Sequence, residues 1–105
     1  MQMNKNYVRG AAFERELVNK YKALDAVAFR SAGSHSQVDV TVIPKTGPVI
    51  FIQAKTTSDE ATAKRMIKNF KEKPFLPRGP YLQVFAVKLK NKGIMMGEVY
   101  PRVAP

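Results

Sequence analysis

Apolar side chains recur at helical spacing near the N-terminus. Within residues 10–24, the spacings between apolar positions are four, four and three, at Phe13, Leu17, Tyr21 and Leu24. This spacing places them on one face of an α-helix. Glu16 and Lys20 lie one turn apart on the outer side, where we expect an ion pair. The pattern predicts an amphipathic helix that packs against the rest of the fold.

Short segments rich in β-branched and aromatic residues follow, bounded by Gly, Pro and Ser, and such segments are typical of β-strands. We predict strands within residues 26–30, 38–43, 49–55, 81–90 and 93–100. The second and third are joined by PKTGP, whose turn residues predict a β-hairpin.

A second helix is predicted in TTSDEATAKRMIKNFKEKP. Thr57 and Glu60 have the spacing of a capping box at its start, and Pro74 ends it. Its inner stripe is predicted to contain Ala63, Met66, Ile67 and Phe70. Another side carries a basic ridge made of Lys64, Lys68 and Lys71. The order αβββαββ predicts an α/β fold, with a mixed sheet flanked by helices in a single domain over residues 1–105.

The net charge of the chain indicates which class of binding partner it favours. The chain has 18 Lys and Arg against 8 Asp and Glu, a formal net charge of +10. Such a field favours a polyanion, and nucleic acid fits better than an acidic membrane surface. Cysteine is absent, which excludes disulfides and thiolate metal sites. The longest apolar run, VIFI, is too short to span a bilayer, and the N-terminal segment lacks a signal sequence, so we expect a cytosolic protein without membrane contact.

Polar side chains interrupt the most apolar hairpin, at Asp39, Gln53 and Lys55. If Ile43 and Val49 are opposed across the loop, continuing that register places Asp39 opposite Gln53, with Cβ atoms about 4.5–5.5 Å apart. Lys55 points to the same face as Gln53 because it is two residues further along the strand. An unpaired charge inside such a strand costs several kcal/mol at least, so these residues need a reason to be there.

Phosphodiester hydrolysis offers such a reason. The reaction needs an activated water and charge relief at the phosphate, and a hard cation such as Mg²⁺ supplies both when oxygen ligands hold it. Asp39 and Glu14 offer carboxylates, and Gln53 offers an amide oxygen. Lys55 could hold the attacking water or a phosphate oxygen and stabilise developing charge.

Each of these residues also has a plainer interpretation. Asp39 could be an aspartate at a strand end that binds the loop backbone. Lys55 could simply leave the core where its strand ends, and Glu14 could be an ordinary carboxylate on a helix surface. Gln53 is harder to explain in this way, because a buried amide must find hydrogen-bond partners. The conjunction of all four favours the metal site.

Three segments carry a resemblance to a known family. RGAAFEREL, RSAGSHSQVDV and QAK occur in that order within residues 7–55. This pattern resembles the archaeal-type Holliday junction resolvases, members of the PD-(D/E)xK nuclease superfamily with a restriction-endonuclease-like core. The later helix and strands match only in order. The resemblance implies a Mg²⁺-dependent endonuclease, with Mn²⁺ as a substitute, that acts as a C2 homodimer and nicks opposed strands of a four-way DNA junction.

The resemblance also assigns residues. It implies metal ligands at Glu14, Asp39, Gln53 and the Ala54 carbonyl, with Lys55 as the catalytic lysine. Ser34 matches a catalytic-site serine in a mobile loop, and Arg15 and Arg30 match arginines that handle phosphate. One departure is clear: the family usually has Glu at the position of Gln53, so one ligand here is neutral and metal affinity is expected to fall.

Further DNA contacts are predicted from charge. We expect Arg9, Arg15, Arg30 and the basic ridge to bind the backbone, and so to recognise shape with little base readout. The ridge could instead be only a solvated helix face. His35 is predicted to touch the DNA backbone, with metal ligation as the alternative.

The leading hypothesis is therefore a resolvase, with roles in DNA recombination and repair. A DNA-binding module of the same fold that has lost catalysis, and a general nicking nuclease of the same superfamily, are the alternatives. A small basic RNA-binding protein would leave Asp39, Gln53 and Lys55 unexplained.

Overall fold

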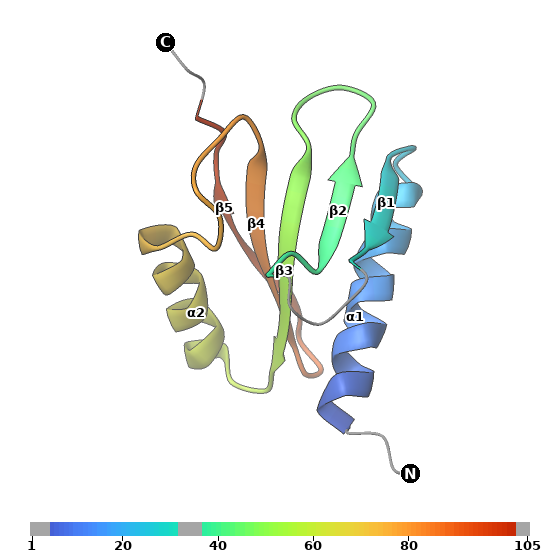
Figure 1. Cartoon of the computed structure of the whole chain (residues 1–105). Coiled ribbons are helices and arrows are strands. Elements are labelled where there is room, and N and C mark those ends of the chain that lie inside the picture. Colours follow the sequence, from blue (N-terminus) through green and yellow to red (C-terminus); the bar gives the residue numbers. More distant parts are fainter. Residues whose placement is uncertain (1–4, 32–36, 103–105) are drawn as a thin grey trace.

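A computed structural model describes residues 5–31 and 37–102, with side chains from residue 10 onward. Two helices and five strands follow one another in the predicted order (Figure 1). In chain order they are α1 (Lys5–Lys22), β1 (Val27–Arg30), β2 (Val40–Ile43), β3 (Ile50–Thr57), α2 (Glu60–Glu72), β4 (Leu82–Leu89) and β5 (Gly93–Val99). Neither helix is long and apolar enough to cross a membrane within the described residues.

The strands form one mixed sheet in the order β1-β2-β3-β4-β5. β3 and β4 are parallel, and the other neighbours are antiparallel. Parallel strands need a crossover connection, which α2 supplies between β3 and β4. Between β2 and β3, Val40 pairs with Ile52 and Val42 with Ile50, which confirms the register predicted from the hairpin loop.

The helices cover opposite faces of the sheet, and β4 shows this by alternation. Val84 and Ala86 pack in the core beneath α1, while Phe85 and Val87 pack in the core beneath α2. In Figure 1, α1 lies beside β1 and β2, and α2 lies beside β4 and β5.

The core under α1 depends on the predicted helix face. Phe13 and Leu17 are fully buried against β-branched residues of β2 and β3. Each such side chain contributes about 1.5–3 kcal/mol through burial. Under α2 the predicted stripe is confirmed: Ala63, Ile67 and Phe70 are buried, and Met66 packs against them.

The first helix differs from the prediction at both ends. It begins at Lys5 rather than Gly10 and ends at Lys22, so Leu24 lies beyond it and is 68% exposed. Asp25 then takes a left-handed conformation with φ 62°, which turns the chain into β1. The predicted pair of Glu16 with Lys20 is replaced by a bond across the fold, since Lys88 Nζ lies 2.7 Å from Glu16 Oε1.

The predicted capping box of the second helix is wrong. Thr57 is the last residue of β3, because that strand keeps pairing with β4 as far as Leu89. The N-cap of α2 is Asp59, whose Oδ1 accepts a hydrogen bond from Ala61 N (3.1 Å). An Asp before the first helical residue is as good a cap as the Thr predicted two positions earlier.

One part of the sheet carries apolar side chains that neither α1 nor α2 covers. On the β1 and β2 face turned away from α1, Val27, Phe29 and Ile43 are 59%, 47% and 44% exposed. Their neighbours in sequence, Ala28 and Val42, are buried under α1. We call Val27, Phe29 and Ile43 the open-face patch.

Candidate active site

The candidate site lies where β2 begins beside the middle of β3. Asp39 precedes the first residue of β2, and its N–H donates to Ile52 O (2.8 Å). A regular antiparallel pair would instead exchange bonds with the directly opposed Gln53. The ladder therefore stops one residue short of the predicted pair, and Asp39 lies at a break between the strands.

The Asp39 side chain takes the place of the missing backbone partner at this break. Its Oδ2 accepts a hydrogen bond from Ala54 N (2.8 Å), the position where a backbone carbonyl would otherwise bond. The N–H and C=O of one strand residue point to the same neighbouring strand, so the Ala54 carbonyl points toward Asp39 as well. The plainer interpretation of Asp39, as a strand-end group that binds the loop backbone, is correct only in that its side chain binds backbone: the partner is Ala54 of β3, not the loop. This bond is compatible with a metal site.

α1 supplies the second carboxylate. Glu14 follows the buried Phe13 and is itself only partly exposed. Its Oε1 lies 3.0 Å from Arg30 Nε, at the end of β1. Arg30, which we predicted to handle phosphate, therefore neutralises one of the two candidate ligands.

Electrostatics couple the two carboxylates. Burial raises the pKa of Asp39 above its usual value, and the charge of Glu14 raises it further. The Ala54 N–H, Lys55 and Arg30 lower the pKa but do not offset the burial. Two acidic groups that repel each other in a partly buried place form a site that a cation would stabilise.

β3 carries the remaining candidates. Gln53 is half-buried and Lys55 is exposed, and strand alternation puts both on one face, as predicted. That face is turned away from α1, which carries Glu14. Lys55 is close enough to Asp39 to lower its pKa. The structure thus brings Glu14, Asp39, Arg30 and Lys55 into one electrostatic cluster.

The donor set suits a hard ion. Two carboxylates, the Ala54 carbonyl and the Gln53 amide are all oxygen donors, which Mg²⁺ prefers. Within the described residues, no group of three or more His, Cys, Asp or Glu side chains could hold a metal. The candidate site therefore offers two carboxylates, those of Glu14 and Asp39.

Other predicted residues lie apart from the cluster. Arg15 is exposed on α1. The basic ridge follows the side of α2 that faces β5, where Lys64, Lys68 and Lys71 line a groove with Met95 and Met96. β5 is two strands from β3, about 10 Å away. Ser34, His35 and the Arg9 side chain lie outside the described residues.

The sequence analysis missed a second group of basic residues near the end of β4. Lys88 and Lys90 lie beside Thr56 and Thr57 of β3 and face α1 across a groove. The signal was the run KLKNK at residues 88–92, whose alternation would point its lysines to one face of a strand.

Comparisons with known proteins concern the fold. No protein-family model matches the sequence, and a search of curated proteins finds no match. Among solved structures, the fold is similar to Hjc, a Holliday junction resolvase from the archaeal hyperthermophile Archaeoglobus fulgidus. The TM-score is 0.56 at 16% sequence identity, over 85% of this chain and 71% of that one. The chain thus shares an α/β fold with this resolvase, and its own mixed five-stranded sheet flanked by helices is as the sequence analysis predicted.

Proposed function

We propose that this protein is a Mg²⁺-dependent, structure-selective endodeoxyribonuclease that resolves four-way DNA junctions by paired nicks as a homodimer. One observation carries the proposal: on a fold shared with a resolvase, Asp39 breaks the β2–β3 ladder beside Glu14, Ala54 and Lys55. A polar break in an apolar hairpin costs stability, and catalysis gives a reason to keep it.

Glu14, Asp39 and the Ala54 carbonyl would hold the ion, with Gln53 as a neutral donor. When bound, Mg²⁺ supplies positive charge that polarises the phosphate and makes water more acidic. Asp39 is oriented for this role because Ala54 N–H fixes one of its oxygens. Arg30 holds Glu14 in place through the 3.0 Å ion pair and balances its charge.

The Lys55 side chain is accessible to a bound substrate. It is exposed and lies close to Asp39. An ammonium group there would donate hydrogen bonds to a phosphate oxygen and stabilise negative charge that develops on it. Junction selectivity would come from shape, through backbone contacts in two copies of the chain related by a twofold axis.

The test is a denaturing gel of an end-labelled four-way junction and a matched linear duplex. We expect paired nicks confined to the junction that require Mg²⁺ or Mn²⁺. Asp39→Asn should slow cutting by at least about 100-fold, since it removes a ligand charge. Asp25→Asn is the matched control, because it makes the same chemical change at an exposed turn.

Each other outcome has a distinct meaning. Equal cutting of both substrates would replace junction resolution by general nicking. Cutting that survives Asp39→Asn would remove this site from the reaction.

A DNA-binding module without catalysis is the second candidate. Gln53 favours it, because a neutral side chain stands where the resembling family usually has an acid. Tight binding of the junction with no cut in either metal would support this candidate against the first.

A further inference from the structure

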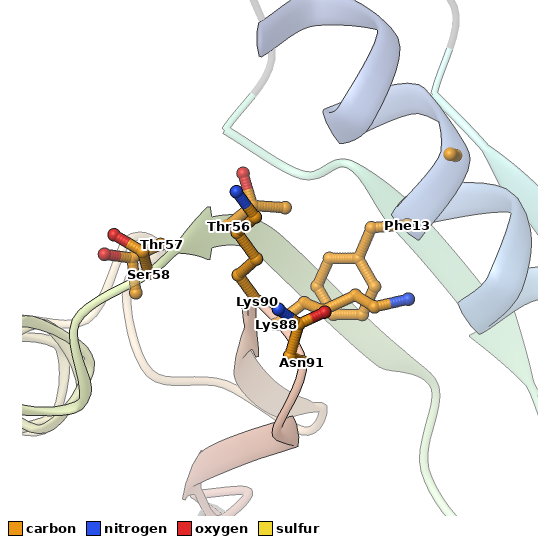
Figure 2. A pocket seen from close by; sticks show the side chains of 8 residues that line it. Phe13, Thr56, Thr57, Ser58, Lys88, Lys90 and Asn91 are labelled. Carbon is orange, nitrogen blue, oxygen red and sulfur yellow. The ribbon is translucent and has the colours of Figure 1, made fainter.

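A groove of about 610 Å³ lies beside the candidate site, on the α1 side of the sheet. Its wall from α1 consists of Ala12 and Phe13, and its other wall comes from the ends of β3 and β4, with Thr56, Thr57, Ser58, Lys88, Lys90 and Asn91. Figure 2 shows Phe13 projecting from α1 toward the strand end that carries Thr56. We call these eight residues the basic groove. Its volume is within the range of ligand-binding pockets.

We propose that the basic groove binds the sugar-phosphate backbone of a DNA strand as that strand leaves the candidate site. The proposal deepens the proposed function, on which it rests, by giving the substrate a second contact. It concerns Lys88, Lys90 and the hydroxyl groups beside them, and it does not require the chain to cut DNA.

The chemistry of the lining fits phosphate. Two ammonium groups, three hydroxyl groups and one amide offer hydrogen-bond donors, and no acidic side chain is among the described residues that line the groove. Lysine, serine, threonine and asparagine are typical partners of DNA phosphates. The lysines also neutralise phosphate charge, which releases counterions and drives binding.

The groove continues the candidate site on two elements. Phe13 is followed by Glu14 on α1, and Thr56 is followed back along β3 by Lys55 and Ala54. Thr56 shares a face with Ala54, whose N–H binds Asp39, and pairs with Lys88 in the next strand. At about 3.3 Å per strand residue, Thr56 and Thr57 lie roughly 10–13 Å along β3 from Gln53. Gln53 and Lys55 point to the opposite face of the sheet, so the part of the candidate site that shares a face with the groove is Glu14 of α1. A strand bound at the site would reach the groove within a few nucleotides.

An ion pair at the margin of the basic groove partly neutralises one of its two lysines. Lys88 Nζ lies 2.7 Å from Glu16 Oε1, and both side chains are substantially exposed, at 40% and 44%. Lys88 also lies over the Phe13 ring, 5.9 Å from its centroid. A phosphate must compete with Glu16 for Lys88. Removing the Glu16 charge should therefore strengthen DNA binding, whereas removing the lysines should weaken it.

The opposite end of the sheet provides matched controls. At the β2–β3 turn, Lys45 Nζ lies 3.4 Å from Asp25 Oδ2, also in an exposed ion pair. Lys45→Gln with Lys22→Gln removes two charges there, as Lys88→Gln with Lys90→Gln does in the groove. Asp25→Asn frees Lys45 as Glu16→Gln frees Lys88, and Asn tolerates the left-handed backbone at this position.

The experiment measures binding of a labelled duplex and a four-way junction by anisotropy, without Mg²⁺, from 50 to 200 mM salt. Each lost phosphate contact on a duplex reduces the salt slope by about 0.9, so the groove double variant should lose about 1.8. From 50 to 200 mM salt, the affinity of both proteins falls, and the factor for this variant should be about 12 times smaller than the factor for the wild type. Glu16→Gln should bind more tightly than the wild type, by more than Asp25→Asn does.

The outcomes separate the two proposals. A smaller slope in the groove variant alone supports the groove, even if the wild type never cuts a junction. An unchanged slope, or an equal loss in the control at the far end of the sheet, overturns the groove while junction cutting can still stand. A wild type that binds neither DNA overturns both.

Discussion

Asp39 is the residue where stability and proposed chemistry conflict. It replaces a backbone partner in the ladder with a side chain, and its carboxylate is half-buried beside another acid. Burial and the Glu14 charge raise its pKa, which means that the folded protein disfavours the ionised form. Functional sites in many proteins carry such a cost in stability.

This conflict predicts a pH dependence of stability. The pKa of Asp39 in the folded state lies above 3.8, its usual value, which applies to the unfolded state. Between these two pKa values, the folded state therefore binds more protons than the unfolded state. The free energy of unfolding should therefore fall as pH rises through that window. Asp39→Asn without metal should melt at a higher temperature than the wild type at pH 7. The gain should shrink as pH falls through that window and disappear below pH 3.8. Calorimetry at both pH values would check this, and a lower melting temperature at pH 7 would contradict it.

Gln53 leads to a prediction about metal affinity. If its amide is a ligand, Gln53→Glu adds a negative charge directly at the ion. Cutting should then saturate at a Mg²⁺ concentration lower by about tenfold or more. Asn69→Asp adds the same charge on the exposed surface of α2 and serves as the control. An unchanged Mg²⁺ dependence in Gln53→Glu would show that this side chain does not touch the ion.

At the scale of elements, the strands and helices were predictable because their apolar patterns are strong. Phe13 and Leu17 gave the buried face of α1, and the loop between Ile43 and Val49 gave the register of the hairpin. Boundaries were less predictable, since they depend on partners distant in sequence. Thr57 belongs to β3 only because β4 continues beside it.

The site was predictable only in part for the same reason. Spacing along one strand related Gln53 to Lys55, but the bond from Ala54 to Asp39 depends on how the ladder ends. The Glu14–Arg30 ion pair joins α1 to β1, and single-sequence spacing does not indicate it. The basic groove forms where α1 meets the ends of β3 and β4. The sequence alone indicates only its lysine run at residues 88–92.

The N-cap of α2 offers a test at this scale. Asp59→Ala should lower the melting temperature by roughly 4–8 °C, because Ala61 N–H and the Thr62 hydroxyl lose their acceptor. Thr57→Ala should lower the melting temperature by less than Asp59→Ala does. If Thr57 were the N-cap, as the capping box predicts, its loss would not be the smaller one. The Thr62 and Ala61 hydrogen bonds lower the pKa of Asp59, so the Asp59→Ala difference should be present above pH 3.8 and shrink as pH falls further. Equal losses in both variants at pH 7 would contradict this assignment.

At the scale of the whole molecule, the charge of +10 is spread over separate surfaces. The basic ridge lies on the side of α2 that faces β5, and the basic groove lies between α1 and the end of β4. DNA that contacts both would have to extend around the sheet, as a branched substrate does more readily than a straight duplex. A second copy of the chain would double these contacts.

The open-face patch is where we expect that second copy to bind. Val27 and Phe29 lie on an edge strand and, with Ile43, expose apolar surface beside the candidate site strands. Clustered apolar side chains of this kind mark interaction surfaces. Sedimentation of the protein alone should give the mass of a dimer. Phe29→Ser should raise its dissociation constant at least about tenfold, because an aromatic residue central to an interface contributes more than 1.4 kcal/mol.

Tyr100→Ser is the control for this prediction, since Tyr100 is 67% exposed but lies beyond the end of β5, outside the patch. It should leave the dimer intact. At protein concentrations low enough to dissociate the dimer, both variants should melt at the wild-type temperature. Loss of the dimer should also convert paired nicks in a junction into single, uncoupled nicks, because each copy would then act alone. A monomeric wild type, or a dimer that Phe29→Ser leaves unchanged, would show that the open-face patch serves another purpose.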